Sequence, residues 1–167
     1  MIIIVSDTSP VRALAHLGLL PVLETLFGEV LVPDSVAQEL LDPPSSFAWI
    51  YVADFGFLKV SRATNRQRVA ELREQLDFGE AEAIALAQEV RAEALLIDER
   101  AGRNAARQLG LSPLGTVGLL LRAKERGLCG DIAPLLDQLR SELRFFISGS
   151  FYVHALRLAG ELPPLAQ

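Results

Sequence analysis

The chain has 167 residues, a length typical of one domain, and half of its residues are apolar. Only 22% are charged, which excludes a disordered chain, and no linker or repeat interrupts it, so we expect a single domain over residues 1–167. The net charge of −5 argues against a broad basic surface for nucleic acid, but it is compatible with acids that gather around metal ions.

Nothing in the composition indicates a membrane or an oxidising compartment. No apolar run approaches the roughly 18 residues of a membrane helix. Residues 1–5 lack the basic flank of a signal peptide. The single cysteine, Cys129, excludes an internal disulfide and a cysteine-based zinc site. We therefore expect a cytoplasmic protein that has no membrane partner.

The first half of the chain is predicted to alternate short apolar strands with helices. Residues 1–5 (MIIIV) do not alternate in polarity, so they predict a strand buried on both faces. Ser9 is expected to cap the helix that follows, with Pro10 in its first turn. In chain order, the elements are a strand at 1–5, a helix at 9–20, a strand at 29–33, a helix at 34–41, a strand at 58–61 and helices at 66–76 and 78–90.

The second half continues the alternation and ends in helices. Residues 94–97 (ALLI) predict another buried strand, and Thr116 is expected to cap a helix. The elements are a strand at 94–97, a helix at 100–110, a short strand within 111–115 and helices at 116–127, 131–143 and 148–161. Strands that alternate with helices indicate a parallel sheet covered on both faces, which is a three-layer α/β/α architecture.

Acidic residues directly follow two of the predicted strands, at the edge where parallel sheets bind ligands. Two buried strands end in Asp7 and Asp98, and open parallel sheets bind ligands beyond the carboxyl ends of their strands. Asp7 alone is equally well explained as a helix cap. Glu39 is predicted to lie beside the buried face of its helix, and Glu80 to open a later helix, where a first-turn acid is ordinary. Glu82 is predicted to be exposed.

Carboxylates that converge repel one another unless they take up protons or a cation. Ligands that are all oxygens fit Mg²⁺ or Mn²⁺. Such a site can activate water for in-line displacement at a phosphodiester. Thr8 and Ser9 would add hydroxyl donors beside the first acid.

Five segments, in this order, resemble the PIN-domain family: DTSP after an apolar strand, PDSVAQEL, FGEAEAIALA, LLIDERAGRNAA and GTVGLLLRAKERG. More narrowly, they are similar to predicted PIN-domain proteins that resemble VapC-type toxins. The resemblance extends from Met1 to about Glu161. It implies a ribonuclease that depends on Mg²⁺ or Mn²⁺, with RNA as its substrate and an antitoxin protein as a candidate partner.

Matched position by position, the resemblance implies roles for a set of named side chains. The implied catalytic acids are Asp7, Glu39, Glu80 and Asp98. The implied metal ligands are Asp7, Asp98 and Glu80, and the implied supporting residues are Thr8, Ser9 and Glu99. The alternative to a nuclease is a non-catalytic PIN-like scaffold that binds RNA or protein.

Two further patterns leave alternatives open. Arginines near the acids are candidate RNA contacts, because guanidinium groups bind phosphate; they are Arg66, Arg68, Arg100 and Arg103. For the first pair a solvated helix face is the simpler explanation, and for the second pair neutralisation of the acids is an equal alternative. The aromatic residues of segment 144–160 indicate a homodimer, unless that segment folds back as core.

Overall fold

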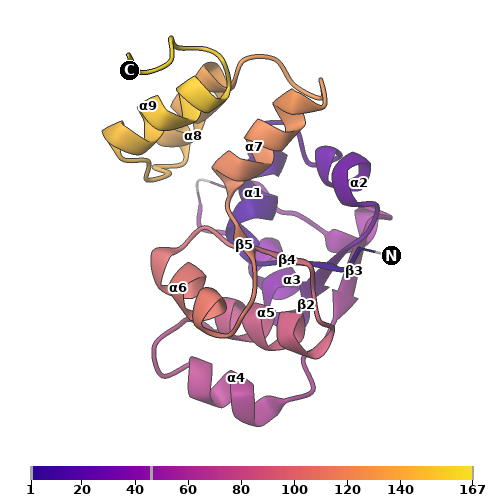
Figure 1. Ribbon diagram of the computed structural model, residues 1–167. Coiled ribbons are helices and arrows are strands. Elements are labelled where there is room, and N and C mark those ends of the chain that lie inside the picture. Colours follow the sequence, from indigo (N-terminus) through magenta and orange to yellow (C-terminus); the bar gives the residue numbers. More distant parts are fainter. Residues whose placement is uncertain (1, 46, 167) are drawn as a thin grey trace. The chain divides into compact units, whose positions relative to one another are not determined.

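The computed structural model describes residues 2–45 and 47–166 (Figure 1). Met1, which the predicted first strand includes, lies outside the described residues. The chain forms two compact units, one that ends at Thr116 and a second that begins at Val117. Within the described residues, no helix combines the length and the apolar character that crossing a membrane requires.

The first unit is built on a sheet that has five strands within the described residues, all paired in parallel in the order β3-β2-β1-β4-β5. The strands are β1 (Ile4–Ser6), β2 (Val30–Pro33), β3 (Leu58–Ser61), β4 (Ala94–Leu96) and β5 (Pro113–Leu114). Strands buried on both faces need apolar side chains at successive positions, which is why their short apolar runs are visible in the sequence. The predicted parallel sheet is confirmed, and β1 and β4 are neighbours as expected.

Helices connect these strands (Figure 1). They are α1 (Thr8–His16), α2 (Val22–Phe27), α3 (Asp34–Leu41), α4 (Arg66–Leu72), α5 (Phe78–Glu89) and α6 (Arg100–Gln108), with a 3-10 turn, η1, at Val52–Asp54. The sequence analysis misses α2 and η1, because elements of six and three residues are too short to show a periodicity. The other predicted helices of this unit are confirmed to within a few residues.

Helix α5 is the core of the first unit. It contacts β1, β2 and β4, and its residues 79–87 are all buried. Its alanines and Ile84 pack with Val5, Leu95 and Ile97 of the sheet. A helix that is buried on every side carries no amphipathic pattern, so its polar residues cannot be assigned to a face from the sequence. The prediction that Glu82 is exposed is accordingly wrong: its exposed fraction is 1%.

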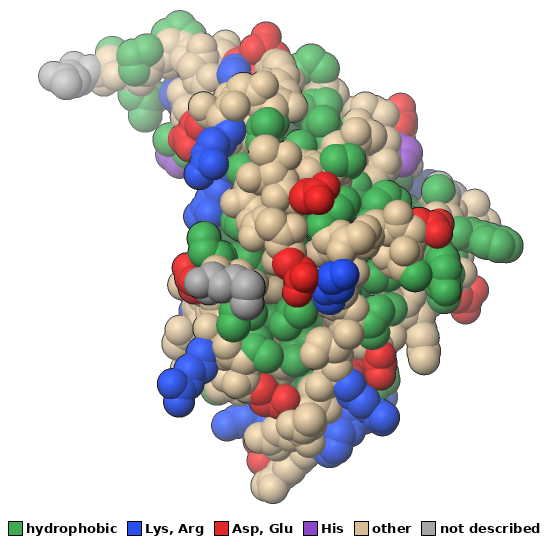
Figure 2. Space-filling model, turned by 90° about the vertical axis from the view of Figure 1, so that its right-hand side faces the viewer, with side chains coloured by type: hydrophobic (Ala, Val, Ile, Leu, Met, Phe, Trp, Pro, Cys, Tyr) green, Lys and Arg blue, Asp and Glu red, His purple; other side chains and the backbone are tan. Residues whose placement is uncertain are grey.

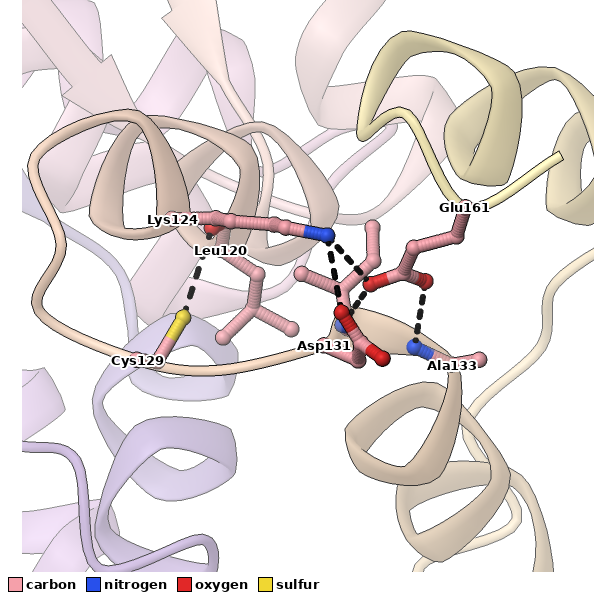
Figure 3. Close-up of polar contacts among 7 residues, drawn as sticks. Leu120, Lys124, Cys129, Asp131, Ala133 and Glu161 are labelled. Carbon is pink, nitrogen blue, oxygen red and sulfur yellow. Dashed lines mark hydrogen bonds and ion pairs between the residues drawn. The ribbon is translucent and has the colours of Figure 1, made fainter.

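The second unit contains the rest of α7 (Thr116–Glu125), α8 (Ile132–Glu142) and α9 (Gly149–Leu158). Glu161 joins them (Figure 3): its carboxylate accepts hydrogen bonds from the backbone N–H groups of Ile132 and Ala133, the latter at 3.0 Å. Lys124 Nζ donates to the same carboxylate at 2.9 Å and to Asp131 at 3.0 Å. One acid therefore caps α8 and connects it to α7.

The aromatic C-terminal segment divides between core and surface. Ile147 and Leu156 are buried, whereas Phe146 is 88% and Phe151 48% exposed. Folding back as core therefore accounts for only part of the segment. The homodimer stays a prediction that depends on the two exposed rings.

Candidate functional site

The ends of β1 and β4 bring two of the predicted acids to one edge of the sheet. Ser6 pairs with Leu96, and the Asp7 N–H donates to the Leu96 carbonyl at 2.9 Å. Asp7 therefore stands level with Ile97, while Asp98 lies one residue further along its own strand. Because successive side chains of a strand point to opposite faces, the two acids have different neighbours.

Asp7 belongs to a cluster of acids on three elements. It is only 4% exposed. Burial raises the pKa of Asp7 well above its usual value, and the charges of Asp77, Glu80 and Glu39 raise it further. Asp7 occupies the N-cap position of α1 but makes no side-chain capping bond. Capping alone therefore does not explain an acid at this position.

Glu80 lies in the first turn of α5, and Asp77 caps that helix. The Asp77 carboxylate accepts from the Glu80 N–H at 2.8 Å, and Glu80 Oε2 accepts from the Asp77 N–H at 3.3 Å. This is a reciprocal capping box. The sequence analysis missed Asp77, although Asp-x-x-Glu at the start of a helix is the signal for such a box. An ordinary role as a first-turn acid therefore explains the contact of Glu80 Oε2, but it does not explain the position of Oε1.

The second oxygen of Glu80 faces the interior. Oε1 is buried and has no hydrogen-bond partner within the described part of the chain. Gly102 of α6 approaches it so closely that a Cβ there would lie 3.1 Å away. Burial, followed by the charge of Asp77, raises the pKa of Glu80 to about 7. The exposed Glu99 adds to this rise through its charge.

Glu39 reaches the same cluster from α3. Its carboxylate accepts a hydrogen bond from the Thr8 hydroxyl. It also lies against Gly79 of α5, where a Cβ would stand 2.6 Å from Glu39 Oε1, so a larger residue would displace the acid. Burial raises the pKa of Glu39, and the Thr8 hydrogen bond opposes that rise. Thr8 thus positions an acid, and its supporting role at a metal site stays a prediction.

Asp98 is held by donors from two other segments. Its Oδ1 accepts from the Thr116 N–H at 2.7 Å. Its Oδ2 accepts from the hydroxyls of Thr116 at 2.7 Å and Ser9 at 2.8 Å. Burial raises the pKa of Asp98, while these hydrogen bonds and the nearby Arg103 oppose the rise. The Ser9 and Thr116 hydroxyls therefore orient an acid. Ser9 lies inside α1, whose N-cap is Asp7, so the prediction that Ser9 caps this helix is wrong.

The cations near the acids take up distinct positions. Arg12, which the sequence analysis does not single out, donates from Nη2 to the Glu39 carbonyl at 3.1 Å and stacks on the Phe47 ring at 4.9 Å. Its place one turn after Thr8 on the same helix was the available signal. Arg103 is partly buried beside Asp98, which favours neutralisation over RNA contact. Arg100 is exposed at the start of α6.

The buried Glu82 connects two helices of the site. Its Oε2 accepts a hydrogen bond from the Ser35 N–H in the first turn of α3 at 3.0 Å. Its Oε1 lies 3.7 Å from the Arg66 guanidinium. Glu39 follows Ser35 by one turn on the same face, so Glu82 helps to set where α3 presents Glu39.

The donor chemistry of the cluster fits a hard divalent cation. Asp7, Glu39 and Glu80 supply only carboxylate oxygens, and the buried, unpaired Glu80 Oε1 lacks a positive partner. Within the described residues, no three His, Cys, Asp or Glu side chains lie close enough together to hold one ion. The acids that would hold it therefore lie near one another without forming a three-residue ligand group within the described residues.

A short-stranded parallel sheet with acids beyond the ends of its central strands defines an α/β protein whose candidate site lies at the strand ends. A family model described as a PIN domain matches residues 3–161, and the chain belongs to the PIN-domain family. The predicted fold is thereby confirmed. PIN domains are commonly nucleases and typically bind divalent metal ions, so this is a nuclease-type fold. A search of curated proteins found no match.

Proposed function

We propose that this PIN-domain protein is an endoribonuclease that depends on Mg²⁺ or Mn²⁺ and hydrolyses RNA phosphodiester bonds. The observation that carries the proposal is the pair of buried acids Asp7 and Glu80, whose exposed fractions are 4% and 5%. Both have raised pKa values, and Glu80 keeps an unpaired oxygen. Such acids require a proton or a cation, and a nuclease site provides a use for the cation.

The roles of the residues follow from their contacts. Asp7, Glu80 and Glu39 would bind the ion, and Thr8 would hold Glu39 in place through its hydroxyl. Asp98, fixed by Ser9 and Thr116, would complete the site from the neighbouring strand. When bound, the ion supplies positive charge to the phosphodiester and polarises the attacking water. The positive charge of Arg12 interacts with Glu39 and Asp7 and offsets part of their negative charge.

An assay of RNA cleavage tests this proposal. Mixed structured RNAs are incubated with Mn²⁺ and the wild-type protein, the Asp7→Asn variant or the Glu89→Gln variant. Asp7→Asn should abolish cleavage, while the metal-free variant keeps its fold and becomes more thermostable because like-charge repulsion is relieved. Glu89 is an exposed acid at the end of α5 whose carboxylate accepts hydrogen bonds from the Thr64 and Asn65 N–H groups, so Glu89→Gln is the control for removing one acid outside the cluster. Full metal-dependent cleavage by Asp7→Asn would show the site assignment to be wrong.

The toxin of a toxin–antitoxin pair is the biological role that we propose for this activity. The chain would then act in the cytoplasm, where its RNA substrates are, and a small protein would bind and inhibit it. Expression of the chain alone should arrest growth, and expression of the Asp7→Asn variant should not. A neighbouring reading frame whose product reverses the arrest would support the role, and equal growth with both chains would contradict it.

Two observations favour a second candidate function, a non-catalytic scaffold. The described acids do not form a three-residue ligand group, and Asp98 is already satisfied by internal donors. A scaffold predicts that Mn²⁺ stabilises the protein without any RNA cleavage. The nuclease predicts that stabilisation and cleavage are both lost in Asp7→Asn.

A further inference from the structure

Helices α4 and α5 place two guanidinium groups around one aromatic ring. Arg73 lies 4.7 Å from the centroid of the Phe78 ring, and Arg66 lies 6.0 Å from it. Arg66 begins α4 and Arg73 is the C-cap residue directly after it, seven residues or about two helical turns away, so both side chains reach the same ring. The attraction between each cation and the ring restricts where the charges can move.

This group borders the acidic cluster. Phe78 is the first residue of α5 and stands directly after Asp77 and two positions before Glu80. Asp77 caps α5, and its charge contributes to the raised pKa values of Asp7 and Glu80. In Figure 2, Lys and Arg side chains gather at the lower end of the view, which is the end where Figure 1 shows α4. Positive charge therefore lies next to the start of α5, where Asp77 caps the helix and Glu80 lies in its first turn.

The arginines in and directly after α4 differ in whether they form ion pairs within the protein. Arg68 pairs with Glu71 at 3.1 Å on the same helix. Arg66 is half exposed, and its ion-pair partner Glu82 lies 3.7 Å away. Arg73 is exposed, and it forms no ion pair with any residue that the structure describes. The charge on Arg73, and part of that on Arg66, is thus available to an external anion.

We propose that Arg66, Arg73 and Phe78 form a phosphate-backbone surface that guides a single nucleic-acid strand to the acids. Guanidinium groups bind phosphate through paired N–H donors, and a ring that holds them in place reduces the ordering that binding requires. This inference rests on the proposed function, since it names where the substrate of that site is held. Of the two sequence-predicted RNA contacts on α4, the surface keeps Arg66 and leaves out Arg68.

The salt dependence of RNA binding tests the surface separately from cleavage. A short labelled single-stranded RNA is titrated with protein in EDTA on the Asp7→Asn background, and the association constant is measured at several salt concentrations. Each lost phosphate contact should reduce the slope of log K against log salt by about 0.7. Arg73→Gln and Arg66→Gln should each show this reduction and weaker binding. Arg68→Gln removes the same charge from the same helix and should leave the slope unchanged.

The outcomes separate this inference from the proposed function. Equal slopes for Arg73→Gln and Arg68→Gln would overturn the surface, and so would an RNA that fails to bind the parent protein. A reduced slope in Arg73→Gln, together with no cleavage by the wild type in Mn²⁺, would support the surface and contradict the nuclease. Circular dichroism checks that each exposed substitution leaves the helix content unchanged.

Discussion

Glu80→Gln should stabilise the metal-free protein in a way that depends on pH. Glu80 has a folded-state pKa of about 7 against an ordinary value of 4.5, because it is buried beside Asp77. The folded state therefore binds this proton more tightly than the unfolded state does. That contribution to stability is complete below about pH 4.5 and is lost as the pH rises through about 7.

The size of the effect follows from the shift. The rise in the pKa of Glu80 from 4.5 to about 7 corresponds to a free energy of unfolding of about 3 kcal/mol. This value is an upper limit, because neighbouring groups relax when Glu80 ionises. Glutamine has no proton to lose and still offers an oxygen to the Asp77 N–H. At about pH 8 the free energy of unfolding of Glu80→Gln should exceed that of the wild type by up to about 3 kcal/mol. The two should converge at about pH 4.5.

Urea denaturation in EDTA, followed by circular dichroism across this pH range, measures the difference. Glu89→Gln on the same helix is the matched control, with the opposite sign. Burial raises the pKa of Glu89, but hydrogen bonds from Thr64 and Asn65 outweigh burial and lower it. Removing that charge should destabilise the protein above about pH 4.5, and the effect should vanish at lower pH. A Glu80→Gln stabilisation that is absent at about pH 8, or equal at both ends of the range, would refute the reasoning.

Two further predictions concern the metal and the helix contact. Mg²⁺ or Mn²⁺ should release protons when it binds near neutral pH, because the pKa values of Asp7 and Glu80 are raised and a cation favours the ionised forms. Calorimetry in two buffers of different ionisation enthalpy should give different apparent enthalpies, and identical values would contradict a shared site. Glu82→Ala should lower the free energy of unfolding by about 1–3 kcal/mol, because it leaves the Ser35 N–H buried without an acceptor. Glu82→Gln, which keeps an acceptor, should lose less in urea denaturation, and equal losses would show that the hydrogen bond is not the cause.

The elements that are predictable from the sequence are those whose apolar pattern depends only on the layer they occupy. Strands buried on both faces appear as runs such as residues 94–97, and acids directly after such runs mark the strand ends. The side of α5 on which Glu82 lies is not predictable in this way, because every side of that helix is buried. Its environment depends on α3, whose residues precede it by more than forty positions.

Hydrogen-bond partners are less predictable than elements. Ser9 and Thr116 stand at helix starts, where a hydroxyl ordinarily caps the helix. In the structure both donate to Asp98, and Ser9 is 89 residues away from it along the chain. Only the pairing of β1 with β4 brings Ser9 to Asp98, and that pairing is a property of the whole sheet. Asp77, in contrast, could have been found from the local Asp-x-x-Glu spacing.

The contacts of Glu161 bear on the order in which the second unit can be completed during synthesis. Its carboxylate is the common acceptor for Lys124 and for the N–H groups of Ile132 and Ala133, yet a ribosome makes it after both helices that it joins. A chain that stopped at Gly160 would leave the Ile132 and Ala133 N–H groups without this acceptor, whereas Lys124 would keep its contact with Asp131. A chain that stopped after Leu162 would keep the acceptor. The part of the α7–α8 connection that runs through Glu161 therefore forms only after Glu161 has left the ribosome.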